Sequence, residues 1–291
     1  MSRALLAICL LAVLTACNRS GAETESASTE DYCQLGEDAL TEDNSEAAIE
    51  AFENCLTTAD LEPGEEAVIH TRLGGAYLYL DRFEEALQEF NLAYAIAETQ
   101  GVRFDNPYVR RNRGIARRYV GQTEGALEDL EAAARELPND IMTQLNLGGL
   151  YADLDRQAEA IAAFDAVTRI EPEWAGGWTN LSAAFLEFGL MEDAIDSARQ
   201  AVELEPESGF SLNALCWALI VDDQHELALP LCDQAVAAEP DNGAIIHSRA
   251  AALEGVGRLD EARELYARAY ELYPNSSVIE DDYRRTRAEA D

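Results

Sequence analysis

The sequence predicts an all-α protein built as a stacked array of short helical hairpins. Across five ungapped windows from Pro107 onward, the 291-residue sequence repeats every 34 residues. Apolar residues recur at helical spacing within each window. One proline and one alanine also recur once per window, namely Pro138, Pro172, Pro206, Pro240 and Pro274, and Ala126, Ala160, Ala194, Ala228 and Ala262. A fixed period of this length is typical of a stacked array.

Each period contains two amphipathic helices. In the unit that starts at Ile141, one apolar face ends at Leu154, and a second begins after Asp155-Arg156. With Pro107 counted as the first place of its unit, small residues such as Gly114 fill the eighth place, where two helices must approach closely. Proline ends the second helix, and an Asn, Asp or Ser caps the next one.

The repeated residues resemble the tetratricopeptide repeat. The fullest match is made by Asn146-Leu147-Gly148, Tyr151, Ala160, Phe164 and Pro172. The resemblance covers roughly residues 29–275. It implies a right-handed solenoid of about seven helix-turn-helix repeats, with units starting near residues 29, 67, 107, 141, 175, 209 and 243. Residues 276–291 are polar, which suits a capping helix and tail that close the array.

The N-terminus has the features of a bacterial lipoprotein signal. Arg3 gives a basic start, and Ala4–Val13 is an apolar run too short to span a bilayer. The run ends in Leu14-Thr15-Ala16-Cys17, which resembles a lipobox. The resemblance implies a signal peptide over residues 1–16, acylation of Cys17 and a flexible tether over residues 17–28. The alternative is an ordinary secretory signal that happens to contain a cysteine.

Such a signal places the protein at the periplasmic face of the bacterial outer membrane. Asn18 follows the cysteine, where an aspartate would favour the inner membrane, the less favoured location. The lipid is then the only contact expected with the membrane. A tether of this length reaches about 20 Å, so the array is expected to lie close to the membrane surface.

Four cysteines remain in the array. Cys33 and Cys55 hold the fifth and twenty-seventh places of the first unit, and Cys216 and Cys232 hold the eighth and twenty-fourth places of the sixth. Residues in an antiparallel helix pair face each other when their places sum to a constant, and both sums are 32. We therefore expect disulfides Cys33–Cys55 and Cys216–Cys232, in keeping with an oxidising compartment. The alternative is four buried thiols at places that usually hold small or apolar residues.

The charge excludes several classes of partner. The formal net charge is −35, and no residue is a lysine. Phosphate binding needs a basic surface, so a nucleic-acid partner is not expected. Solubility or adaptation to a saline medium explains the acidity without a specific ligand.

One segment is basic. It contains Arg103, Arg110, Arg111, Arg113, Arg117 and Arg118. Arg113 occupies a place that is usually core, and with Asp129 it resembles a subclass of repeats in which this pair forms a structural ion pair. Arg111 and Arg118 occupy places that face the concave groove of the solenoid.

The first helix of each repeat lines the concave groove of such an array, so the groove residues are those whose places on these helices point inward. The candidates are Tyr108, Arg111, Asn112, Arg118, Asn146, Asn180, Phe210, Asn213 and Trp217. Asn112, Asn146 and Asn180 are spaced by one period, so they could form an amide ladder that holds a peptide backbone. Asparagine is also common at this place without a ligand role. Trp217 with Phe210 could form an apolar pocket, unless the last unit or the capping helix covers it.

No catalytic or metal-binding motif is present. Of the three histidines only His247 is expected to face the groove, and it has no sequence-close Cys or His partner; the chain contains neither CxxC nor HExxH. We therefore expect a non-enzymatic scaffold without cofactor or metal that binds a peptide segment of another envelope protein. The alternative is a structural subunit of a permanent envelope assembly, such as pilus, secretion, outer-membrane or cell-wall machinery.

Overall fold

The described part of the protein is entirely helical. The structure is a computed structural model that describes residues 31–102, 104 and 106–288, and within these it contains fifteen helices and no strand. The expected signal peptide, Cys17, the tether and Arg103 lie outside the described residues. No helix within the described ranges combines the length and apolar character needed to cross a membrane.

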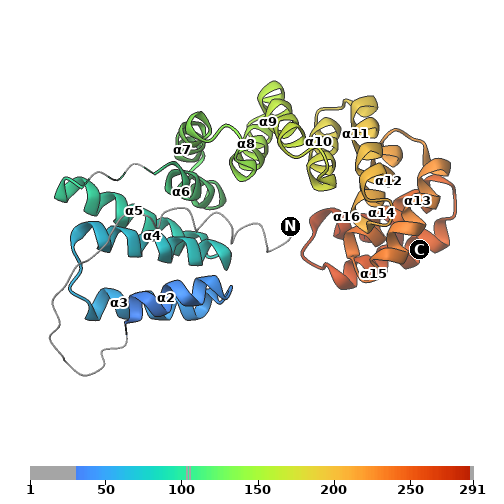
Figure 1. Ribbon diagram of the computed structural model, residues 1–291. Helices are drawn as coiled ribbons and strands as arrows, with labels where there is room; N and C mark the ends of the chain where they lie inside the picture. The colour runs from blue at the N-terminus through green and yellow to red at the C-terminus, as the bar shows by residue number, and fades with distance from the viewer. Residues whose placement is uncertain (1–30, 103, 105, 289–291) are drawn as a thin grey trace. The chain divides into compact units, whose positions relative to one another are not determined.

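The chain divides into two compact units, Met1–Pro138 and Asn139–Asp291. The first unit contains three helical hairpins, each formed by consecutive helices (Figure 1). Its helices are α2 (Tyr32–Thr41), α3 (Ser45–Thr58), α4 (Pro63–Tyr79), α5 (Phe83–Gln100), α6 (Pro107–Tyr119) and α7 (Thr123–Glu136). Helix α4 begins at Pro63, ahead of the unit start near Ala67 that the repeat pattern indicates.

The second unit contains four hairpins and a final single helix. Its helices are α8 (Ile141–Asp153), α9 (Gln157–Ile170), α10 (Ala175–Glu187), α11 (Met191–Leu204), α12 (Gly209–Val221), α13 (His225–Ala238), α14 (Gly243–Gly255), α15 (Leu259–Leu272) and α16 (Ser277–Ala288). Helix α10 packs on α12, and α12 packs on α14, so the first helices of successive hairpins form one layer. The expected solenoid of about seven repeats and a capping helix is confirmed.

Every hairpin turn uses a residue at the fifteenth place of its unit. In all seven hairpins this residue is an Asp or a Gly, residue types that adopt the left-handed backbone conformation more readily than most. The residues with positive φ at this place are Asp43, Asp81, Gly121, Asp155, Gly189, Asp223 and Gly257. The amide of the next residue then bonds back to the helix, as in Arg156 N–H to Tyr151 C=O at 2.8 Å. The recurrence of Asp and Gly therefore fixes where each first helix ends.

Caps fix the other ends of several helices. The side chain of Asp140 accepts from the Thr143 amide at 2.9 Å at the start of α8, and Asn242 caps α14 in the same way.

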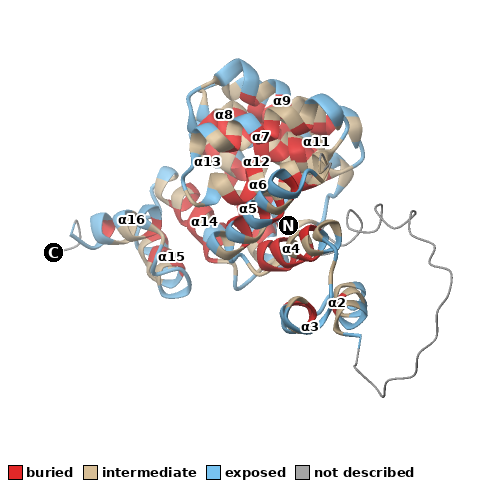
Figure 2. Cartoon of the chain, turned by 90° about the vertical axis from the view of Figure 1, so that its left-hand side faces the viewer, coloured by how far each residue is buried: buried red, intermediate tan, exposed pale blue. Residues whose placement is uncertain are grey.

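The two helices of a hairpin meet where the eighth place faces the twenty-fourth. Gly148 lies against the ring of Phe164, and a Cβ added at Gly148 would come within 2.9 Å of that ring. Gly74 faces the fully buried Phe90 in the same manner. Buried residues accordingly lie where helices face one another, and exposed residues lie on their outer surfaces (Figure 2).

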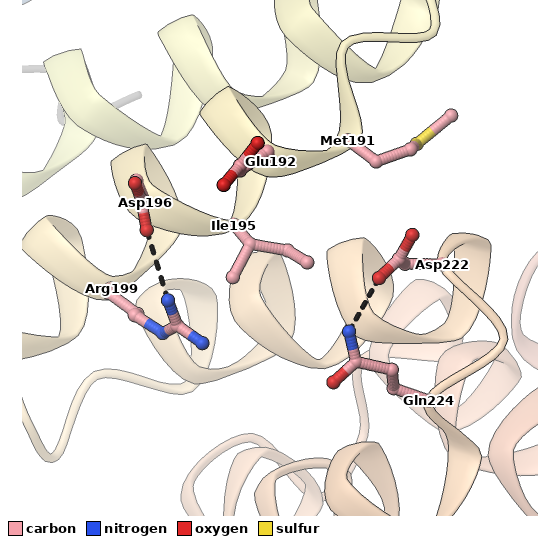
Figure 3. Close-up of a pocket in the computed structure, with 7 residues that line it drawn as sticks. All are labelled: Met191, Glu192, Ile195, Asp196, Arg199, Asp222 and Gln224. Carbon is pink, nitrogen blue, oxygen red and sulfur yellow. Dashed lines mark hydrogen bonds and ion pairs between the residues drawn. The ribbon is translucent and has the colours of Figure 1, made fainter.

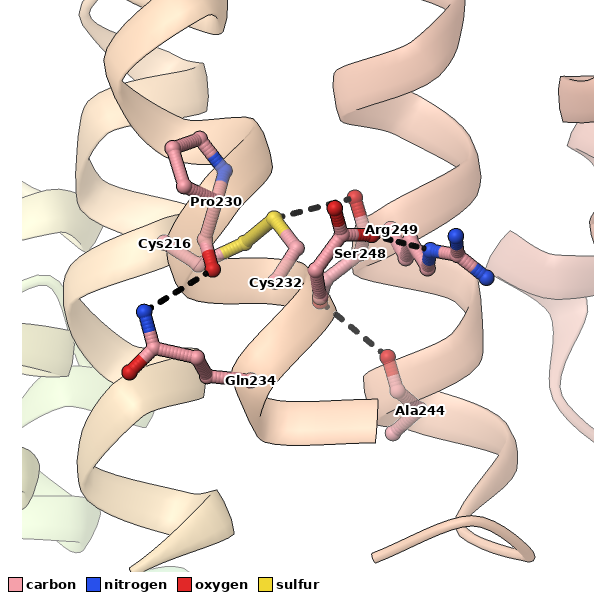
Figure 4. The surroundings of a disulfide bond; sticks show 8 residues. Cys216, Pro230, Cys232, Gln234, Ala244, Ser248 and Arg249 are labelled. Carbon is pink, nitrogen blue, oxygen red and sulfur yellow. Dashed lines mark hydrogen bonds and ion pairs between the residues drawn. A yellow bond between two sulfur atoms is a disulfide. The ribbon is translucent and has the colours of Figure 1, made fainter. Parts of the chain in front are cut away.

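Both expected cysteine pairs are disulfide-bonded in the structure. Cys33 and Cys55 join α2 to α3 across a Cα–Cα distance of 5.0 Å, and Cys216 and Cys232 join α12 to α13 across 5.5 Å. The second disulfide lies in the fully buried core, with Cys232 Sγ 3.9 Å from the Ser248 carbonyl oxygen (Figure 4). Each disulfide therefore links the two helices of a single hairpin.

Candidate functional site

Two arginines of α6 bind one buried carboxylate of α7. Arg113 donates to both oxygens of Asp129, at 2.8 and 2.7 Å, and Arg117 donates to one of them at 2.8 Å. Asp129 is only 3% exposed. Arg113 and Asp129 thus form the ion pair expected from the sequence, and Arg117 joins it.

The same arginine lies over an aromatic ring of the preceding hairpin. The Arg113 guanidinium carbon is 3.8 Å from the centre of the Tyr94 ring, a favourable cation–π arrangement. Burial acts to lower the pKa of Arg113, but its hydrogen bonds to Asp129 and its charge interactions with Asp129 and Tyr94 together outweigh that effect and leave the pKa raised. Arg113 is therefore a permanently charged structural group that links α6 to its neighbours.

The sequence pattern indicated that Arg111 faces the open groove, but in the structure it is buried. It is 4% exposed, and its Nε and Nη2 both donate to Asn112 Oδ1, at 2.9 and 2.8 Å. Its guanidinium also lies 5.5 Å from the centre of the Tyr108 ring. The expectation that Arg111 offers a cation in an open groove is wrong, because neighbouring groups bury and engage its guanidinium.

Two further arginines of the basic segment, Arg110 and Arg118, are also engaged. Arg110 bonds Glu136 at 2.6 Å, and the half-buried Arg118 lies 5.9 Å from the centre of the Tyr119 ring. Tyr119 itself is 56% exposed and stacks on Phe83 at 4.2 Å. This part of α6 is consequently a network of contacts within the first unit rather than a row of open cations.

The three asparagines of the expected ladder each have part of their hydrogen-bonding capacity occupied. Asn112 accepts from Arg111, whereas the side-chain NH₂ groups of Asn146 and Asn180 donate to carbonyls four residues earlier, both at 2.8 Å. A ligand would therefore bond to the side-chain oxygens of Asn146 and Asn180, and to the side-chain NH₂ group of Asn112. Asn112 belongs to the first unit and the other two to the second.

Helix α12 presents an apolar surface in the second unit. Phe210 is 61% exposed and Val221 is 38% exposed, although both side chains are large and apolar. Trp217 is half-buried and tilts against the His247 ring at 5.9 Å, and Ile220 is buried in the core. The neighbouring repeat thus covers Ile220 and part of Trp217, but it leaves Phe210 open.

Asn213 lies one helical turn from Phe210, and its side-chain oxygen is buried. This oxygen accepts no hydrogen bond from the described residues. A buried acceptor without a donor is uncommon and calls for an explanation. Phe210, Asn213, Trp217 and Val221 together are called the α12 surface below.

His247 faces the final helix rather than an open groove. It is 6% exposed, its Nε2 lies 2.8 Å from Asp282 Oδ2, and its ring lies 5.4 Å from that of Tyr266. Arg285 of the same final helix binds Glu254 of α14 through both of its terminal nitrogens, at 2.5 and 2.9 Å. These contacts attach α16 to α14, and the sequence contained no signal for them beyond the polar character of α16.

A separate hollow lies between α11 and the turn that follows α12 (Figure 3). Its lining residues are Met191, Glu192, Ile195, Asp196, Arg199, Asp222 and Gln224. Arg199 bonds Asp196 at 3.0 Å, and Gln224 donates to Asp222. Within the described residues, no group of three or more His, Cys, Asp or Glu side chains could hold a metal ion.

Comparison with known families assigns the repeats. One model of the tetratricopeptide repeat matches residues 111–173 and 213–277, and a second model of that repeat matches residues 67–100. Together they match more than half of the sequence. The chain belongs to the tetratricopeptide repeat family. No curated protein sequence matches it.

Solved tetratricopeptide repeat structures share the fold. A tetratricopeptide repeat protein of Parabacteroides merdae is 15% identical, with a TM-score of 0.70 over 88% of this chain and 97% of that one. The C-terminal part of a repeat protein from Cytophaga hutchinsonii is 15% identical, with a TM-score of 0.60 over 85% and 98%. YrrB, a repeat protein with an unusual peptide-binding site, is 21% identical, with a TM-score of 0.51 over 63% and 89%.

The family defines the general class of function. Tetratricopeptide repeat arrays are generally non-enzymatic scaffolds for protein–protein interaction, and the fold of this chain supports that role. Function in such arrays resides in the surface side chains that the fold displays. The α12 surface is the candidate in the second unit, because it combines exposed apolar side chains with an unpartnered acceptor.

Proposed function

We propose that this tetratricopeptide repeat protein is a lipid-anchored adaptor at the periplasmic face of the bacterial outer membrane. It binds a peptide segment of another envelope protein on the α12 surface. The observation that carries the proposal is Phe210, which is 61% exposed on a helix whose other large apolar residues are mostly buried. Exposed apolar side chains grouped in this way often mark partner sites.

The physical chemistry of the α12 surface suits a peptide. Covering an exposed Phe side chain contributes about 1.5–3 kcal/mol when it is fully buried. Asn213 Oδ1 is a buried acceptor that lacks a donor. If the Asn213 side chain rotates toward the surface, a peptide N–H can supply that donor. The peptide-binding site of YrrB supports the proposal that the shared fold can accommodate such a ligand.

The anchor rests on the N-terminal sequence. Arg3, the apolar run Ala4–Val13 and Cys17 in the lipobox-like segment support export and acylation. Replacement of Cys17 with Ser should abolish incorporation of a labelled fatty acid and release the protein from the membrane fraction. Continued labelling of the Cys17→Ser protein would contradict the anchor.

The binding role can be tested by site-specific crosslinking in cells. A photoreactive amino acid replaces Phe210, and in a matched control it replaces Leu227, which is 60% exposed on α13. The proposal predicts a discrete crosslinked protein from position 210 that is absent from position 227. Equal products from both positions, or none from position 210, would contradict peptide binding at the α12 surface.

A further inference from the structure

We propose that the peptide bound at the α12 surface is basic, with a large apolar residue flanked by Lys or Arg side chains. This inference rests on the proposed function and specifies its ligand. It follows from the distribution of charge over the first helices of the hairpins. That distribution differs sharply between α6 in the first unit and helices α8, α10 and α12 of the second.

Three consecutive first helices of the second unit contain no basic residue. In α8 and α10 the only charged residues are Asp153 and Glu187, and α12 contains none. By contrast, α6 contains five arginines and no acidic residue. A ligand on the α12 surface therefore meets apolar, amide and carboxylate groups, and no cation of α8, α10 or α12.

Glu187 is the carboxylate best placed to contact such a ligand. It is exposed at the thirteenth place of its unit, the place that Val221 occupies one repeat later. Because α10 packs directly on α12, equivalent places on these helices lie side by side. An extended segment that covers Val221 would bring its neighbouring side chains to Glu187, where a Lys or Arg is favoured and an Asp or Glu is disfavoured.

Four of the five α6 arginines are already engaged or buried, which disfavours α6 as a site for an acidic peptide. Arg113 and Arg117 share Asp129, Arg110 bonds Glu136, and Arg111 is buried. The net charge of −35 adds a long-range attraction for cationic segments. Local and overall charge thus favour the same class of ligand.

Three labelled twelve-residue peptides test the inference. They share the same Leu and Phe residues and differ only at four positions, which are all Lys, all Gln or all Glu. Binding to the mature chain, residues 17–291, is measured by fluorescence anisotropy at low and high salt. We expect the Lys peptide to bind about tenfold more tightly than the Gln peptide, the Glu peptide to bind most weakly, and the differences to shrink in about 1 M salt, where charges are screened within about 3 Å.

Two variants and a control separate the charge inference from the proposed function. Glu187→Gln should reduce the preference for the Lys peptide, whereas Glu264→Gln, at an exposed position on α15, should not. Phe210→Ser should weaken binding of every peptide that binds. Equal binding of all three peptides, or preference for the Glu peptide, would overturn the charge inference alone if Phe210→Ser still weakens binding. No binding, or binding unaffected by Phe210→Ser, would overturn both proposals.

Discussion

Cys216 and Cys232 form their disulfide at the two places where other hairpins set a glycine against an aromatic ring. In α8–α9 these places hold Gly148 and Phe164, and in α4–α5 they hold Gly74 and Phe90. A covalent bond thus replaces an apolar contact at the centre of one hairpin. This equivalence allows the contribution of the disulfide to be separated from that of the packing it replaces.

Removal of this disulfide should destabilise the second unit. Replacing Cys216 and Cys232 with Ala should lower the free energy of unfolding by about 2–4 kcal/mol, because the unfolded chain gains freedom. The measurement is urea denaturation with and without reductant. Both proteins carry Ala at Cys33 and Cys55, so reductant should destabilise the one that keeps Cys216–Cys232 and leave the one without it unchanged. Equal sensitivity of the two proteins to reductant would contradict the assignment of the Cys216–Cys232 disulfide.

Neutralising Asp129 should destabilise the first unit strongly. Asp129→Asn leaves the half-buried Arg113 and Arg117 without their shared buried anion, a change that costs about 3–5 kcal/mol when a buried pair is broken. Asp233→Asn is the control, because its carboxylate is exposed and its pair with Arg249 contributes less than about 1 kcal/mol. Chemical denaturation of both variants checks the prediction, which fails if their losses are equal.

A methyl group at the eighth place should disturb helix packing. In Gly74→Ala the added carbon would lie 2.7 Å from the fully buried Phe90 ring, so we expect a loss of about 1–3 kcal/mol from overpacking. Gly64→Ala in the same helix is the control, since its nearest neighbour would be Val102 at 3.7 Å. Thermal denaturation should show a lower midpoint for Gly74→Ala only. A similar decrease in both variants would indicate that the helix, and not the contact, is responsible.

Attachment of α16 should weaken in acid. The hydrogen bond from Arg285 lowers the pKa of Glu254 below its usual value of 4.5 despite the opposing effect of burial. A carboxylate with a lowered pKa in the folded state stabilises that state above its unfolded pKa, and this contribution is lost as pH falls through the folded pKa. Stability should therefore decrease from about pH 5 downward.

Hydrogen exchange of α16 measures this effect. The Glu254→Gln variant should show faster exchange in α16 than the parent protein at neutral pH, and the difference should disappear in acid. Glu264→Gln, on α15, again serves as the control. A difference between Glu254→Gln and the parent protein that persists unchanged below the folded pKa would contradict a role for ionised Glu254.

The sequence by itself determined the hairpins and their turns. The period of 34 residues located Pro138 and its equivalents, and the Asp or Gly at each fifteenth place determines where the chain can turn. The cysteine pairs were also predictable, because facing places in one hairpin depend only on local helix geometry. Such features are set within one repeat, and so they can be read from the order of residues.

Only the tertiary structure decided which inward-facing side chains remain accessible. Arg111 and Phe210 both occupy places predicted to face the groove, yet Arg111 is 4% exposed and Phe210 is 61% exposed. His247 likewise contacts Asp282, thirty-five residues away on α16. Accessibility depends on which neighbouring helix packs over a side chain and on which polar partner engages it. The contact of His247 with Asp282 forms between α14 and α16, and those of Arg111 with Asn112 and Tyr108 depend on side-chain conformation, so the periodic pattern is the same whether or not they are made.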